Sequence, residues 1–296
     1  MKKLSIILFL TFTTSFTPIA AKFVVHEIHP IILAFIRFGI ATILLLIVFK
    51  FKKLNFKIDP KDRLKFIFLG ALVIPINQMC FLYGINLSTA SHSGIIYSCT
   101  PLLSYLIAIM INNEKFFVKK LGYILISVVG ILVIFSDSLL KMGAGSFSFY
   151  GDILLFFAVA SWASYITLSK DMVIKYGAVK ASSISFSIGM VMFVPIFLFN
   201  LDKFSLNNIT PIGYLAFFHL AVIVAFGGYF VFSYSTKILT VSTLATLTNA
   251  SPVFTILFSW ILLKESLTIY FLIGAIITLT GVILTQSIKE NILILE

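Results

Sequence analysis

The sequence predicts an all-α membrane protein with ten transmembrane helices, arranged as two inverted five-helix repeats. Three observations predict it: the apolar composition, the length of the apolar runs and a motif that recurs after 151 positions. Of the 296 residues, 60% are hydrophobic and only 11% are charged, whereas soluble domains carry about 25% charged residues. A soluble chain of this length has too little interior to hide so much apolar surface. The composition therefore excludes an ordinary soluble enzyme, a disordered protein and a disulfide-stapled secreted domain.

Ten apolar runs are each long enough for a helix that crosses a bilayer, which takes about 20 residues. They cover residues 4–21, 31–49, 66–85, 93–112, 121–137, 151–169, 181–199, 211–233, 242–263 and 269–288. The segment 66–113 carries no charged residue, and the polar stretch 86–93 divides it into two spans, so nine helices is the nearest alternative count. Continuous runs also exclude a transmembrane β-barrel, whose strands alternate in hydrophobicity. A cleaved signal peptide is the alternative for the first run.

The lysines and arginines predict how these helices are oriented. With the N-terminus inside, 17 of them fall in inside segments and 4 in outside segments. This excess follows the positive-inside rule. It accounts for the net charge of +11 without a nucleic-acid partner. We expect a multi-pass protein of the inner cell membrane with both termini in the cytoplasm.

The second half of the chain repeats motifs of the first. Five residue pairs are separated by 151 positions: Tyr83 and Tyr234, Ser91 and Ser242, Pro101 and Pro252, Glu114 and Glu265, Gly130 and Gly281. Lys22 and Lys170 are separated by 148. The repeats are predicted to cover residues 1–145 and 146–296, with five helices each. Because five is odd, the second half enters the membrane inverted, which is typical of secondary transporters.

These motifs resemble the EamA-type ten-helix branch of the drug/metabolite transporter superfamily. The resemblance rests on three sets of residues: Lys22, Pro30 and Arg37-Phe38; Gly84, Ser91, Pro101, Glu114 and Gly130; Trp162, Lys170, Ser242, Pro252, Glu265, Gly274 and Gly281. It implies an inverted five-plus-five bundle that moves small polar metabolites by alternating access. One departure is Thr14, which stands where the family usually has the tryptophan that the second repeat keeps as Trp162.

Polar residues inside the predicted spans are the candidates for a substrate pathway, because unpaired polar groups are costly in the membrane. Pro75 can kink the third span and free a carbonyl beside Asn77 and Gln78. Two equivalent mid-helix motifs add Ser98, Thr100, Pro101, Thr248, Asn249 and Pro252. The alternatives are an interhelical hydrogen bond for the amides, and prolines that only shape the bundle while the hydroxyls bond freed carbonyls.

Aromatic and charged residues complete the set. Trp162, Tyr165 and Tyr229 are placed to stack on a planar cargo, or else to anchor helix ends at the membrane interface. Arg37 and His219 are candidates for a charge or coupling role. The alternative for Arg37 is a structural role in which it bonds backbone carbonyls. The alternative for His219 is a hydrogen bond to a single carbonyl. Glu114 and Glu265 look like boundary residues, and Cys80 and Cys99 like free thiols.

We therefore expect a secondary carrier that moves a small polar or amphipathic metabolite, such as an amino acid, across the inner membrane. No catalytic motif, metal-binding spacing or phosphate loop is present in the sequence, so we expect no enzyme, cofactor or metal. An integral membrane enzyme acting on lipid-linked substrates and a passive channel are the alternatives. The expected partners are the lipid bilayer and the small-molecule cargo, with no nucleic acid; a homodimer is compatible with the sequence.

Overall fold

The computed structural model describes residues 2–112, 117–140, 148–205, 209–228 and 241–287. Within them, the side chains of residues 2–7, 112, 137–140, 241–249 and 286 are not described. The first repeat contains α1 (Lys2–Val25), α2 (Pro30–Phe51), η1 (Pro60–Asp62), α3 (Arg63–Ala71), η2 (Leu72–Ile76), α4 (Asn77–Leu87), α5 (Ala90–Ser98), α6 (Thr100–Asn112) and α7 (Val118–Leu140). The second contains α8 (Ser148–Tyr176), α9 (Ala178–Leu198), η4 (Leu201–Lys203), α10 (Pro211–Phe218), η5 (His219–Gly228), α12 (Val241–Leu262) and α13 (Ile269–Ser287).

The prediction of a ten-helix all-α protein is confirmed, and the described residues contain no strand. Eight helical segments of these residues are long and apolar enough to span a membrane. Two shorter apolar helices, Ala250–Leu262 and Ile269–Thr285, complete the ten. The third span is the succession η1, α3, η2 and α4, and the fourth is α5 followed by α6. The boundary predicted between residues 145 and 146 lies outside the described residues, and the two domain ranges stay a prediction.

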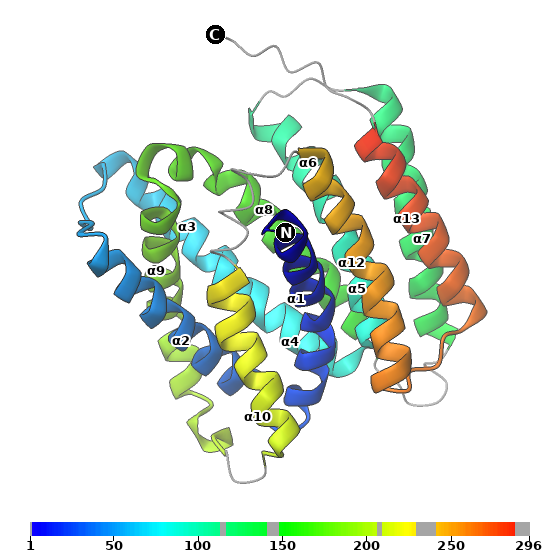
Figure 1. The fold of residues 1–296 in the computed structure, drawn as a ribbon, viewed down its shortest axis with the longest axis horizontal. Coiled ribbons are helices and arrows are strands. Elements are labelled where there is room, and N and C mark those ends of the chain that lie inside the picture. The colour runs from blue at the N-terminus through cyan, green and yellow to red at the C-terminus, as the bar shows by residue number, and fades with distance from the viewer. Residues whose placement is uncertain (1, 113–116, 141–147, 206–208, 229–240, 288–296) are drawn as a thin grey trace.

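The helix contacts are those expected of two inverted repeats related by a two-fold axis. Equivalent helices of the two halves pack on each other: α2 on α9, α5 on α12 and α7 on α13. α1 packs on α10, η5 and α12, and its counterpart α8 packs on α4, α5 and α6. Figure 1 shows α7 and α13 side by side at the right edge of the bundle.

Glycines bring several of these helices into close contact. A Cβ added to Gly84 of α4 would lie 2.9 Å from the Leu155 nitrogen of α8. A Cβ added to Gly189 of α9 would lie 2.6 Å from the Gly70 carbonyl of α3. Gly130 and Gly281 make the same kind of approach between α7 and α13. Small residues at membrane helix contacts are expected, because packing rather than the hydrophobic effect drives association there.

Side-chain contacts place the connections at two opposite ends of the bundle. At one end, Glu27 accepts hydrogen bonds from the Thr210 amide (3.1 Å) and hydroxyl (2.6 Å) and thereby joins the α1–α2 and η4–α10 loops. At the other, Lys180 donates to the Lys57 carbonyl over 2.7 Å and joins the 52–59 connector to α9. We call the Glu27 end the predicted external end and the Lys180 end the predicted cytoplasmic end.

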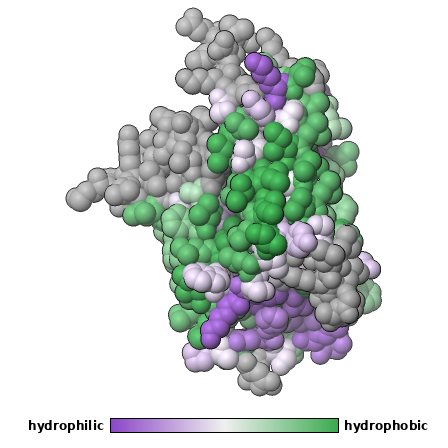
Figure 2. Space-filling model, turned by 90° about the vertical axis from the view of Figure 1, so that its right-hand side faces the viewer, coloured by the Kyte–Doolittle hydropathy of each residue, from purple (hydrophilic) through white to green (hydrophobic). Residues whose placement is uncertain are grey.

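The surface of the bundle has the banding of a membrane protein. In Figure 2, a broad hydrophobic band lies between more hydrophilic regions at the top and the bottom. Large exposed side chains of α7 and α13 contribute to the apolar surface, among them Leu132 and Ile276. Such a continuous apolar face suits contact with lipid tails rather than water.

Candidate functional site

The third span is interrupted where the sequence predicts it, at Pro75. Proline has no backbone N–H and cannot continue the regular hydrogen-bond ladder. The chain responds with the π-helical turn η2, which contains Pro75 and leads into α4. The Leu72 carbonyl in this turn accepts a hydrogen bond of 2.7 Å from the Ser161 hydroxyl of α8. The interruption thus turns the beginning of α4, with Asn77 and Gln78, toward α8 and α2.

Three buried polar side chains form one hydrogen-bonded chain across the bundle, which we call the Arg37 network: Arg37, Gln78 and Asn77. Arg37 donates from Nη1 to Gln78 Oε1 over 3.2 Å, and Gln78 donates from Nε2 to Asn77 Oδ1 over 2.5 Å. Asn77 donates to the Ala158 carbonyl over 2.7 Å. The structure therefore brings together three of the residues selected from the sequence.

The positive charge of this network has no counter-charge close to it. Arg37 is 4% exposed, and no carboxylate of the described residues lies within 4 Å of its guanidinium. Its Nε donates to the Leu220 carbonyl of η5 over 3.1 Å. Such a bond to a carbonyl agrees with the alternative given for Arg37 in the sequence analysis, that of a structural arginine. The guanidinium carbon also lies 5.3 Å from the centre of the Phe38 ring.

His219 lies beside this network, where α10 passes into η5. Its ring is 7% exposed and meets the Phe16 ring edge-on, with 5.3 Å between the ring centres. The ring faces the backbone of Thr13, and Arg37 lies within electrostatic range. Neither His219 Nε2 nor the Thr13 hydroxyl has a hydrogen-bond partner. His219, which the sequence selects as a candidate for a charge or coupling role, therefore lies next to Arg37.

The proline motifs of the two repeats differ in the structure. The first interrupts its helix, with Cys99 as a turn between α5 and α6, whereas α12 runs unbroken through Pro252. The continuous α12 accommodates Pro252 within the helix by local adjustment, as transmembrane helices can. The hydroxyls of Ser98 and Thr100 bond the carbonyls three residues earlier, over 2.6 and 2.7 Å.

Other candidates lie apart from the network or beyond what is described. Trp162 and Tyr165 of α8 stack on each other with 5.7 Å between ring centres, one turn past Ala158. Tyr229 lies outside the described residues. The side chains of Thr248 and Asn249 also lie outside the description, and only their place in α12 is given.

A closure at the predicted external end includes Glu265, which sequence reasoning treated as a boundary residue; we call it the external closure. It comprises Lys22, the α4–α5 turn, Ser259 and Glu265. Lys22 donates to the last carbonyls of this turn, those of Ile85 (2.8 Å), Asn86 (3.1 Å) and Ser88 (2.5 Å). Glu265 accepts from the Ala90 amide (2.7 Å) and from the Ser91 amide (3.0 Å) and hydroxyl (2.6 Å). Each charge thus complements the helix end of opposite partial charge.

A buried carboxylate supports the closure from α8, and sequence reasoning missed it. Asp152 is 0% exposed and lies 3.0 Å from His92 Nδ1, and Ser88 donates a hydrogen bond to it. His92 stacks on Phe271, with 5.1 Å between ring centres. An acidic residue inside an apolar run was a usable signal, because a carboxylate there needs a partner. Its partners, His92 and Ser88, lie 60 and 64 positions earlier in the chain, so the sequence does not show that they pair with Asp152.

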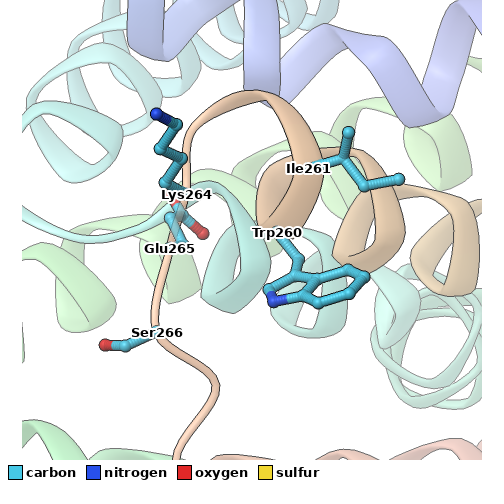
Figure 3. Close-up of a pocket in the computed structure, with 5 residues that line it drawn as sticks. All are labelled: Trp260, Ile261, Lys264, Glu265 and Ser266. Atoms are coloured by element: carbon cyan, nitrogen blue, oxygen red, sulfur yellow. The ribbon is translucent and has the colours of Figure 1, made fainter.

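Two cavities differ in their place along the bundle. One of about 560 Å³ lies among α6, α7 and α8 and is lined by Ser104, Lys120, Thr167 and Lys170 among others. Lys170 is exposed and makes no hydrogen bond with the described residues, whereas Lys22, its counterpart in the repeat, makes three. The other, about 400 Å³, is formed by the segment Trp260–Ser266 alone, with Lys264 and Trp260 pointing apart (Figure 3).

Comparisons with known proteins agree with this architecture. The chain is 26% identical over 282 residues to the uncharacterized transporter YetK of Bacillus subtilis, which covers 92% of this chain and 83% of YetK. An uncharacterized transporter of Archaeoglobus fulgidus is 25% identical, over 90% of this chain and 91% of the relative. A WAT1-related chloroplastic protein of Arabidopsis thaliana is 25% identical, over 75% of this chain and 55% of the relative.

The fold and the family are shown by two further comparisons. A solved crystal structure with 13% sequence identity superposes with a TM-score of 0.61 over 94% of both chains, which shows the fold. The model of the EamA-like transporter family matches residues 1–136 and 149–286. These matches cover nearly the whole chain and include both halves. The protein therefore belongs to the EamA-like transporter family and is a multi-pass membrane transporter.

Proposed function

We propose that the protein is a secondary carrier of the inner membrane that moves a small polar or amphipathic metabolite by alternating access. The cargo would bind between the halves, around the Arg37 network. One observation carries the proposal: the two halves of the bundle differ in conformation. The fourth span is broken at Cys99 whereas its counterpart α12 is continuous, and Lys22 and Glu265 close the α4–α5 turn at the predicted external end.

The argument follows from the inverted repeat. If both halves had the same conformation, the two-fold axis would make the two ends equivalent. The halves instead differ, because the fourth span is broken at Cys99 and α12 is continuous. Exchanging the two conformations between the halves would open the external end and close the cytoplasmic one. The noncovalent contacts of the external closure are of a kind that can break and re-form in such an exchange.

Cysteine accessibility in membrane vesicles tests this mechanism. Cys80 and Cys99 are first replaced by alanine, and a single cysteine is then placed at Ser104, in the 560 Å³ cavity, or at Ser259, in the external closure. We expect a membrane-impermeant maleimide to label Ser104→Cys rapidly from the predicted cytoplasmic side and Ser259→Cys only slowly from the external side, because only the minor open population exposes Ser259. Rapid labelling of both positions, at similar rates from opposite sides, would instead indicate a passive channel and refute the carrier.

A further inference from the structure

The charge of Arg37 is incompletely satisfied by the protein. A guanidinium has five N–H donors, and Arg37 uses two of them, on Leu220 and Gln78. The other three have no partner among the described residues. Arg37 follows the start of α2 by seven residues, about 10 Å along the helix axis. A cation at this depth needs a compensating group, and intramembrane charges of this kind mark substrate or ion pathways.

Two further polar atoms without partners lie on this side of the bundle. His219, adjacent in sequence to the Leu220 that Arg37 binds, is unpartnered at Nε2, and Thr13 of α1, whose backbone faces the His219 ring, is unpartnered at its hydroxyl. Thr13 is 2% exposed. Its counterpart in the second repeat, Ser161, has its hydroxyl bonded to the Leu72 carbonyl over 2.7 Å. The two equivalent hydroxyls of the repeats therefore differ, and the one without a partner is on α1.

The surroundings indicate which kind of anion would fit. A planar guanidinium matches a planar carboxylate with two parallel hydrogen bonds. Phe16 meets His219 edge-on, and Phe12 stacks on Phe16 with 5.4 Å between ring centres, so the nearby wall is apolar. One cation with no second basic side chain in hydrogen-bonding contact balances a single negative charge. The chain has only one other arginine, Arg63, which is exposed on α3.

We propose that Arg37 binds the carboxylate of the cargo, with the Thr13 hydroxyl as an additional donor, and that the cargo is a small organic monocarboxylate with an apolar body. This inference rests on the proposed carrier function and specifies its substrate class. Gln78 orients the guanidinium by accepting from Nη1, and the Leu220 carbonyl fixes Nε. The terminal nitrogen Nη2 is left to face the ligand.

Ligand binding to the full-length protein in detergent tests the proposal. The probes are benzoate and hexanoate, each compared with its neutral amide, together with phosphate and chloride, all in gluconate buffer. We expect a saturable rise of Tm with benzoate, hexanoate or both, and none with benzamide, hexanamide or phosphate. Arg37→Gln is expected to raise the apparent Kd of the carboxylates about tenfold or more, since it removes a charge-assisted hydrogen bond. Arg63→Gln is the matched control and should leave the Kd unchanged.

Two variants keep the test decisive if Arg37→Gln does not fold. Arg37→Lys keeps the charge and should bind more weakly, and Thr13→Val should raise the Kd about threefold while keeping the side-chain volume. The proposal is overturned if no carboxylate stabilises the wild type, if acids and amides bind equally, if chloride or phosphate alone binds, or if the variants keep the wild-type Kd. Opposite-side labelling of Ser104→Cys and Ser259→Cys then tells whether the carrier mechanism fails as well.

Discussion

Replacing Glu265 by glutamine should loosen the external closure by a predictable amount. The carboxylate accepts hydrogen bonds from two amides and one hydroxyl at the start of α5. Glutamine keeps one acceptor oxygen but loses the charge that favours a helix N-terminus, an effect of about 0.3–1 kcal/mol. It also loses one charge-assisted hydrogen bond, worth about 1.5–3 kcal/mol. Because the site is partly exposed, we take the lower part of this range, about 2 kcal/mol in total.

A loss of about 2 kcal/mol shifts the closed-to-open equilibrium about thirtyfold toward opening. The assay is the rate at which a membrane-impermeant maleimide labels Ser259→Cys from the external side, in the background without Cys80 and Cys99. Ser259 is 0% exposed in the closed arrangement and lies 2.6 Å from Ser91. We expect the labelling rate to rise by about thirtyfold in Glu265→Gln, because only the open population reacts.

A matched variant lies next to the site. Lys264 is exposed and makes no hydrogen bond with the described residues, so Lys264→Gln should leave the labelling rate within about twofold of the parent. If Glu265→Gln also stays within twofold, the carboxylate does not hold the closure and the reasoning is refuted. A rise in both variants would point instead to a general loosening of the loop.

Three other changes have expected outcomes. Gly84→Val should lower the Tm, with a loss of about 1–3 kcal/mol from overpacking against α8, whereas Gly122→Val, with nothing within 4 Å of its Cβ position, should not. Asp152→Asn should destabilise the protein by about 1–3 kcal/mol in chemical unfolding, since it weakens the buried hydrogen bonds with Ser88 and His92; an unchanged midpoint would contradict this role. Lys22→Met should speed external labelling of Ser259→Cys, because three carbonyls lose their donor; slower labelling would contradict it.

The sequence predicts the number of helices and their family, since length and hydropathy reflect the thickness of the bilayer. It also selects Arg37, Gln78 and His219, and the structure places Gln78 and His219 each beside Arg37. What it does not predict is the face that each helix turns inward. Lipid tails are as apolar as a protein interior, so a helix that is hydrophobic all round carries no amphipathic signal.

This limit bears on particular candidate residues. The hydroxyls of Ser98 and Thr100 bond the Ile95 and Tyr97 carbonyls, which matches the alternative in which they satisfy freed carbonyls. Asp152 and Glu265 each have partners that lie 60 or more positions away in sequence. A pairing over such a separation depends on the packing of whole helices, which the spacing of residues within one segment does not encode.

The external closure also has a consequence for biosynthesis. Glu265 bonds an amide 175 positions earlier in the chain, and Thr255 bonds the Ser15 carbonyl 240 positions earlier. During translation, α1 and the start of α5 are made long before α12 and the loop that follows it. Until then the amides of Ala90 and Ser91 have no carboxylate to bond, and α1 lacks its contact with α12. The first repeat therefore completes its packing only after the second has entered the membrane, and the final structure forms once nearly the whole chain has been made.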